Sequence, residues 1–179
     1  TMYIIGLNAF HGDSSACLLK DGHLIGAAEE ERFRRIKHWA GFPSEAIKWC
    51  LFEEGINLED VEHIALNQNA KANLGRKIMF TFNKRPSLKM LLDRFQNKRK
   101  RLDIKDQLLK AFPNSKFNGS IHSVEHHTAH LSSAFHTSHF SDAVVVSIDG
   151  FGDFASSAWG VGQDIRIDLE DRVYFPHSL

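Results

Sequence analysis

Three short apolar runs separated by polar turns open the chain, and this pattern most constrains its fold. Residues 3–8 and 16–19 are apolar, as expected of buried strands, and residues 24–28 form a third such run. Asp21-Gly22 lies between the second and third runs, and an Asp-Gly pair in this setting is a strong signal for a β-hairpin turn. The sequence therefore predicts strand, polar turn, strand, hairpin and strand.

Helices and strands are expected to alternate through the rest of the chain. Ser44 is a good N-cap for a helix that Gly55 would end. The apolar patterns further predict strands over 61–66, 120–124, 143–148, 155–161 and 165–169, and helices over 86–92, 104–112 and 126–136. Strands with hairpins and interleaved helices indicate an α/β domain with a mixed sheet.

Length and composition fit one domain or one large lobe of a bigger protein. The 179 residues are 42% hydrophobic and 25% charged, which is ordinary for a packed globular domain. A formal net charge of zero provides no overall field toward nucleic acid or membranes. Two cysteines fit a reducing compartment, and no signal peptide or membrane span is visible, so we expect a cytoplasmic protein.

Residues 71–112 differ from the rest of the chain because Lys and Arg greatly outnumber Asp there. We interpret this stretch as a basic helical insert. A basic stretch can bind RNA or a polyphosphate, but charge runs are more often a solvated surface. The second interpretation is preferred, and the role of the insert stays open.

The segment Glu125-His126-His127-Thr128-Ala129-His130 is the first place that suggests chemistry. On a helix, residues four apart lie on one face, so His126 and His130 are positioned to bind one metal ion through their imidazoles. A carboxylate would have to complete the ligand set. His127 is expected to point elsewhere, and the alternative is a helix with unrelated histidines.

Two further segments join strands through small polar residues. After the strand 143–148, Asp149, Gly150 and Gly152 suggest a glycine-rich turn that approaches a phosphate or holds a metal, or else an ordinary hairpin. The early loop contains His11, Asp13, Ser14 and Ser15. His11 is a candidate general base, and the small residues could bind a phosphate, although a plain polar turn is equally compatible.

These segments together resemble the O-carbamoyltransferases of nodulation and antibiotic tailoring. The resemblance is carried by residues 3–66, including AEEERF, and by residues 117–179, including HHTAH and IDGFGD. It implies an actin-like fold, related to acetate and sugar kinases, of which this chain would be the N-terminal lobe. The chain stops at FPHSL, which looks like the start of another element, so we expect a truncated protein that is inactive alone.

The resemblance also implies a reaction and roles for residues. A synthase domain outside this chain would make carbamoyl-adenylate from carbamoyl phosphate and ATP, and the actin-like domain would transfer the carbamoyl group to a small-molecule alcohol. The metal would be iron, with zinc or magnesium as alternatives. The implied metal ligands are His126, His130 and Asp149, His11 and Asp13 would lie at the acceptor, and Lys37 would contact a ligand.

Three competing functions share some of these features. A kinase or ATPase of the same superfamily would have the glycine turns but would not need the histidine pair. A relative that transfers threonylcarbamoyl to tRNA would use the basic insert as an RNA surface, although the EEERF segment fits the small-molecule branch better. A non-catalytic interaction module would bind a partner through the insert.

Overall fold

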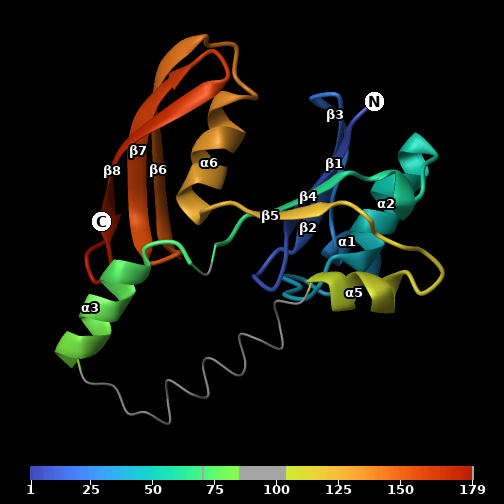
Figure 1. Cartoon of the computed structure of the whole chain (residues 1–179), viewed down its shortest axis with the longest axis horizontal. Coiled ribbons are helices and arrows are strands. Elements are labelled where there is room, and N and C mark those ends of the chain that lie inside the picture. Colours follow the sequence, from blue (N-terminus) through green and yellow to red (C-terminus); the bar gives the residue numbers. More distant parts are fainter. Residues whose placement is uncertain (70, 85–103, 179) are drawn as a thin grey trace. The chain divides into compact units, whose positions relative to one another are not determined.

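The computed structural model describes residues 1–69, 71–84 and 104–178, and for residues 81–84 it describes the backbone alone. Its contacts form two compact units, Thr1–Leu66 with Pro86–His122 and Asn67–Arg85 with Ser123–Leu179 (Figure 1). The single lobe over residues 1–179 that the sequence suggested stays a prediction. Each unit has its own sheet and its own buried apolar cluster.

The first unit is built on a five-stranded mixed sheet. Its strand order is β3-β2-β1-β4-β5, with β1 antiparallel to β2 and parallel to β4. The strands are β1 (Tyr3–Asn8), β2 (Ser15–Lys20), β3 (His23–Glu29), β4 (His63–Leu66) and β5 (Ser120–Ser123). The predicted hairpin is confirmed, since Lys20 pairs with His23 across Asp21 and Gly22. Both turn residues have positive φ, 48° and 86°, as a type I′ turn requires.

Helices pack on this sheet and complete the core of the first unit. They are α1 (Glu31–Arg34), α2 (Ser44–Glu54), the 3₁₀ helix η1 (Leu58–Asp60) and α5 (Ile104–Ala111). The most deeply buried apolar side chains come from strands and helices alike: Ile5, Leu18, Ile47, Ile64 and Leu108. The helix predicted over 104–112 is therefore confirmed as α5, whereas the one predicted over 86–92 lies outside the described residues.

The second helix ends as predicted but begins differently. Gly55 terminates α2 in the left-handed conformation, with φ of 72°. Ser44 is not its N-cap, because Pro43 occupies that position without a capping side chain. The buried carboxylate of Glu30 instead accepts hydrogen bonds from the N–H groups of Glu45 and Ala46. Capping rules consider only residues next to the helix start, so they do not predict a cap by Glu30, which is distant in the chain.

The second unit contains a three-stranded antiparallel sheet and two helices. The order β6-β7-β8 follows the chain, and α6 packs Leu131 and Phe135 against Val145 and Ala158. The elements are α3 (Leu74–Lys84), α6 (His126–Phe135), β6 (Asp142–Gly152), β7 (Ala155–Gln163) and β8 (Arg166–Tyr174). One face of α3 contacts this unit, since Phe80 packs edge-on against Phe154 and Phe175.

One expectation about β6 was wrong, and its burial differs between its two faces. The strand continues through the predicted glycine turn to Gly152, and the chain reverses at Asp153 and Phe154, whose φ values are 48° and 75°. Only one face of the strand is covered, because Val144, Val146 and Ile148 are exposed while Val145 is buried. An apolar run predicts a strand, but it does not tell which face is covered.

No helix among the described residues is both long and apolar enough to cross a membrane.

Candidate functional site

The three predicted metal ligands come together in the second unit. His126 and His130 lie one turn apart on α6, and Asp149 lies near the end of β6, which packs against this helix. His126 Nε2 is 2.7 Å from Asp149 Oδ2, His130 Nε2 is 3.4 Å from the same oxygen, and the two Nε2 atoms are 3.1 Å apart. The predicted one-face spacing of the histidines is thus realised beside a carboxylate.

These donor atoms fit a metal ion. Ligand atoms that each lie about 2.1 Å from one ion are separated from one another by about 3 Å, close to the separations found here. Two imidazoles and one carboxylate suit iron or zinc. The His126 side chain is only 14% exposed, whereas Asp149 and His130 are 41% and 49% exposed, so the group is open to further ligands on one side.

Electrostatics keep the Asp149 carboxylate ready to bind a cation. The hydrogen bond from His126 lowers the pKa of Asp149, and the N–H of Gly150, 2.6 Å from Oδ1, lowers it further. The carboxylate is therefore ionised at neutral pH, as a metal ligand must be.

Two carboxylates outside the predicted set, those of Asp153 and Glu125, fix the start of α6. Asp153 Oδ2 accepts the N–H of His126 at 3.0 Å and the N–H of Asn69 at 2.7 Å. Glu125 Oε2 caps the helix by accepting the N–H of Thr128, and Arg172 lies 3.3 Å from it. Burial alone would raise the pKa of Glu125, but the hydrogen bonds from Thr128 and the Arg172 charge lower it. An acid directly before an apolar helical pattern was the signal for Glu125.

The two glycines near Asp149 differ in what surrounds them. A Cβ atom at Gly152 would overlap the imidazole of His126, so this position provides the room that the ring occupies. A Cβ atom at Gly150 would meet nothing within 4 Å. The close approach of the His126 ring therefore explains why position 152 is a glycine. No neighbouring atom requires a glycine at position 150.

His127 faces the interior, in agreement with its exclusion from the predicted ligands. It is fully buried, and its Nδ1 lies 2.9 Å from the hydroxyl of Ser147 on β6. Within the described residues its Nε2 has no hydrogen-bond partner. His127 therefore packs α6 against the sheet while its neighbours face the acid.

The early loop of the first unit pairs Asp13 with a histidine that was not predicted. His38 Nδ1 is 2.7 Å from Asp13 Oδ1, and the His38 N–H donates to Glu31 Oε2 at 3.0 Å. Ligand atoms of all three side chains lie within 4.8 Å of one another. The hydrogen bond to Asp13 is the main cause that raises the pKa of His38. The signal for His38 was its place directly after Lys37.

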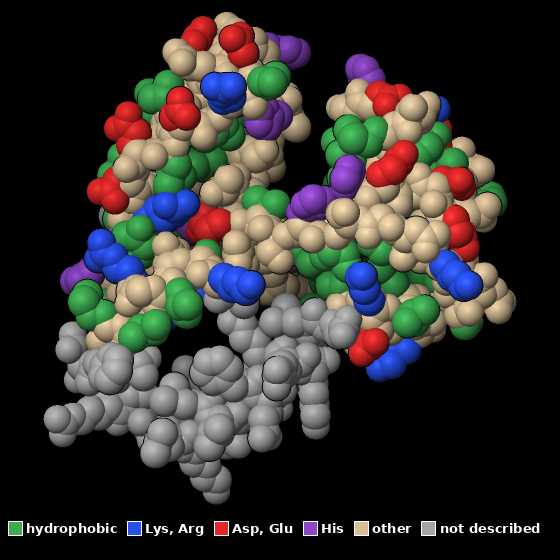
Figure 2. All heavy atoms as spheres, viewed as in Figure 1, with side chains coloured by type: hydrophobic (Ala, Val, Ile, Leu, Met, Phe, Trp, Pro, Cys, Tyr) green, Lys and Arg blue, Asp and Glu red, His purple; other side chains and the backbone are tan. Residues whose placement is uncertain are grey.

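The other predicted residues of this unit take different positions. His11 and Lys37 are exposed. Ser14 is buried, and its Oγ lies 3.0 Å and 2.8 Å from the carbonyl oxygens of His11 and Gly41, so its hydroxyl holds the loop. Ser15 is the first residue of β2. Histidine side chains are visible on the surface of both units in Figure 2.

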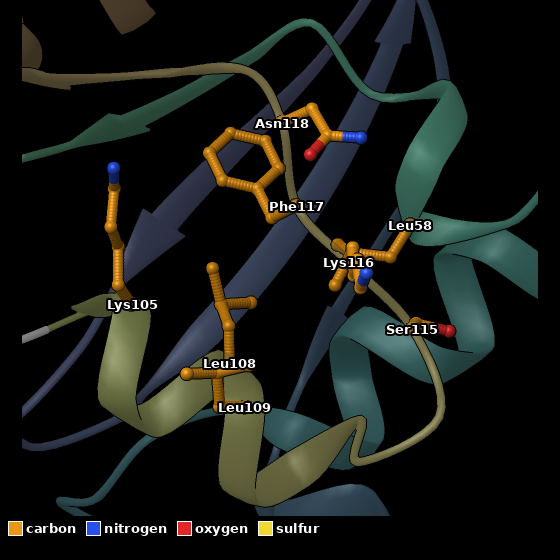
Figure 3. A pocket seen from close by; sticks show the side chains of 8 residues that line it. All are labelled: Leu58, Lys105, Leu108, Leu109, Ser115, Lys116, Phe117 and Asn118. Carbon is orange, nitrogen blue, oxygen red and sulfur yellow. The ribbon is translucent and has the colours of Figure 1, made fainter.

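A cavity in the first unit involves none of the predicted residues. It measures about 310 Å³ and lies between α5 and the segment before β5 (Figure 3). Its lining is largely aliphatic and aromatic, with two lysines: Leu58, Lys105, Leu108, Leu109, Ser115, Lys116, Phe117 and Asn118. The ionisable groups in this lining are those of Lys105 and Lys116, and it contains neither a carboxylate nor a histidine.

Comparison with solved structures supports the fold. YeaZ from Pseudomonas aeruginosa, an actin-like protein, superposes with a TM-score of 0.52 at 14% sequence identity, covering 98% of this chain and 68% of YeaZ. At this identity the likeness shows a shared fold: mixed α/β with a mixed sheet.

Comparison with known sequences identifies the family. Two relatives are each 33% identical: the uncharacterized protein sll1178 of Synechocystis, over 99% of this chain, and the nodulation protein NolNO of Sinorhizobium fredii, over 96%. The chain spans only 30% and 24% of their respective lengths. The family model described as carbamoyltransferase N-terminus matches residues 3–179. The chain therefore belongs to the carbamoyltransferase family and represents its N-terminal region.

Proposed function

We propose that this chain is part of an ATP-dependent O-carbamoyltransferase that moves the carbamoyl group of carbamoyl-adenylate onto a hydroxyl of a small-molecule acceptor. The observation that carries the proposal is the convergence of His126, His130 and Asp149 in a member of this family. Family membership supports carbamoyl transfer, and the two-histidine, one-carboxylate set gives the reaction a place for a metal ion.

The metal side of the proposed reaction rests on the second unit. His126 and His130 would hold the ion through their Nε2 atoms, and Asp149 through its carboxylate. When bound, the metal would supply positive charge that stabilises the leaving phosphate of AMP. Glu125 and Asp153 hold the first turn of α6 and so keep both imidazoles oriented toward Asp149.

The acceptor side of the proposal rests on the early loop of the first unit. His11 and Asp13 are assigned to the acceptor hydroxyl, and exposed Lys37 to an anionic part of a ligand. Ser14 supports the loop from within, and Ser15 with Gly150 and Gly152 completes the proposed ligand-binding residues. Carbamoyl phosphate and ATP would be consumed by a synthase domain outside this chain, with the protein acting in the cytoplasm.

Metal content of the purified chain tests whether His126, His130 and Asp149 bind a metal ion. We expect near-stoichiometric iron or zinc in the wild type, and loss of most of it in His126→Ala and His130→Ala. His136→Ala is the matched control, because His136 is an exposed histidine just after the same helix. Equal metal content in all four proteins would contradict the proposed centre.

A kinase or ATPase of the same superfamily is the alternative hypothesis. The complete gene product would then hydrolyse ATP without carbamoyl phosphate, and His126→Ala would leave that hydrolysis unchanged. The proposed transferase instead requires carbamoyl phosphate for pyrophosphate release, and the isolated 179-residue chain should show no carbamoyl transfer.

A further inference from the structure

Two loops of the first unit are joined into one structure around Asp13 and His38. Phe10 N–H donates to the carbonyl of Gly41, and Ser14 N–H donates to that of Trp39, both at 3.0 Å. These bonds connect the loop after β1 with the segment that leads into α2. The pairing of Asp13 with His38 is therefore held by backbone contacts on both sides of it.

The backbone at this junction is strained. Phe10 and Asp13 in the first loop, and Arg35 and His38 in the second segment, all have positive φ, between 56° and 65°. None of them is a glycine, and side chains disfavour this left-handed region. Such strain persists where surrounding contacts impose it, and it is concentrated at functional sites.

The paired side chains have the arrangement of an oriented base. An ionised carboxylate only accepts hydrogen bonds, so the contact of Asp13 Oδ1 with His38 Nδ1 selects the tautomer of His38 with hydrogen on Nδ1. The lone pair is then on Nε2, which has no hydrogen-bond partner among the described residues, and the His38 side chain is 65% exposed. This nitrogen is available to a hydroxyl of a bound molecule.

We propose that His38 accepts the proton of the acceptor hydroxyl during carbamoyl transfer, with Asp13 fixing its tautomer. This inference rests on the proposed function. The acceptor oxygen forms a bond to the carbamoyl carbon, and the bond from that carbon to the phosphate oxygen breaks. AMP leaves with the bonding electron pair, and the hydroxyl proton goes to Nε2 of His38. In this scheme Asp13 is a positioning residue, and His38 takes the role of base that the sequence suggested for His11, which keeps its place beside the acceptor.

The charges around His38 set the direction of its pH dependence. Asp13 from the loop after β1, Glu31 from α1 and Glu29 from β3 all face it, and all favour the imidazolium. Only neutral His38 accepts a proton, so transfer should fall as pH drops through its pKa. Asp13→Asn removes the largest cause of the raised pKa, and the acidic limb of the pH profile should move to lower pH.

The kinetic test uses the complete gene product with ATP, carbamoyl phosphate, and glycerol, methyl glucoside or N-acetylglucosamine as probe alcohols. His38→Gln should slow carbamoyl transfer about 100-fold or more, the usual contribution of a general base, while pyrophosphate release continues. His23→Gln, an exposed histidine at the start of β3, should match the wild type. If His11→Gln abolishes transfer and His38→Gln does not, the inference is overturned.

Histidine NMR on the 179-residue chain tests the pair without turnover. Nitrogen shifts should show His38 with hydrogen on Nδ1, and its pKa should fall in Asp13→Asn. A pKa that does not respond, or hydrogen on Nε2, would overturn the inference. So would specific broadening of His38 by Mn²⁺, since that would make Asp13, Glu31 and His38 a metal site. Absence of carbamoyl transfer by the wild type would contradict the proposed function, and NMR would still decide the pairing.

Discussion

At the scale of single residues, Gly150 and Gly152 show that two glycines of one segment can have different structural reasons. Both follow Asp149 closely, and the sequence suggested the same role for each. The structure distinguishes them, because only Gly152 lies against the ring of a candidate ligand. The close approach could not be predicted, since it depends on how α6 packs against β6.

Gly152→Ala should weaken metal binding while Gly150→Ala should not. The added methyl group at position 152 would displace the His126 imidazole, and displacing a ligand's support typically costs tenfold or more in affinity. Calorimetric titration of both variants with Zn²⁺ measures the effect. Equal affinities would mean that the ring adjusts without cost.

The two cysteines should react slowly with thiol reagents in the folded chain. Burial raises the pKa of Cys50 to about 11 and also raises the pKa of Cys17, so little thiolate is present at pH 8. Ellman's reagent should therefore detect two thiols rapidly in guanidinium chloride and far more slowly in buffer. Rapid reaction of both in buffer would show that the first unit opens readily.

At the scale of elements, the strands were predicted better than the helix cap and the loop contacts beside them. β1, β2 and β3 were recognisable because their apolar runs are bounded by turn residues, as at Asp21-Gly22. The capping of α2 by Glu30 could not be predicted, because the carboxylate comes from a residue fourteen positions before Ser44 in the chain. In the candidate site, the spacing of His126 and His130 was readable, but the Asp13–His38 pair forms only when two separate loops meet.

Glu30→Gln should destabilise the first unit much more than Glu29→Gln. Glu30 is fully buried and accepts from Arg34 at 2.7 Å and from the N–H groups that begin α2, and breaking such a buried pair costs about 3 kcal/mol. In the part of the chain that the structure describes, the ion pair of Glu29 is an exposed one with Arg32 at 3.8 Å, so its loss should cost less than about 0.5 kcal/mol. Urea unfolding of both variants provides the comparison, and similar midpoints would refute this role of Glu30.

At the scale of the whole molecule, each of the two units contains candidate functional groups of its own. All three candidate metal ligands belong to the second unit, and the Asp13–His38 pair belongs to the first. The tryptophans are divided as well, with Trp39 and Trp49 in the first unit and Trp159 on β7 of the second. Each unit therefore carries its own fluorescent probe.

Zinc should stabilise the second unit selectively. At a free concentration one hundred times its Kd, a ligand that binds only the folded form adds about 2.7 kcal/mol. In a variant that retains only Trp159, zinc should raise the unfolding midpoint, whereas a variant that retains Trp39 and Trp49 should be unaffected. Equal shifts in both would show that the two units unfold as one.

The exposed apolar face of β6 has a further consequence for solubility. Among the described strands, β6 lies at an edge of its sheet, and its Val144, Val146 and Ile148 side chains are 76%, 57% and 65% exposed. An exposed apolar edge is a template for pairing with another chain. The formal net charge is zero at pH 7, so no net repulsion keeps copies of the chain apart. Light scattering should show aggregation that is fastest near neutral pH, slows as the histidines become charged, and is suppressed in Val146→Lys.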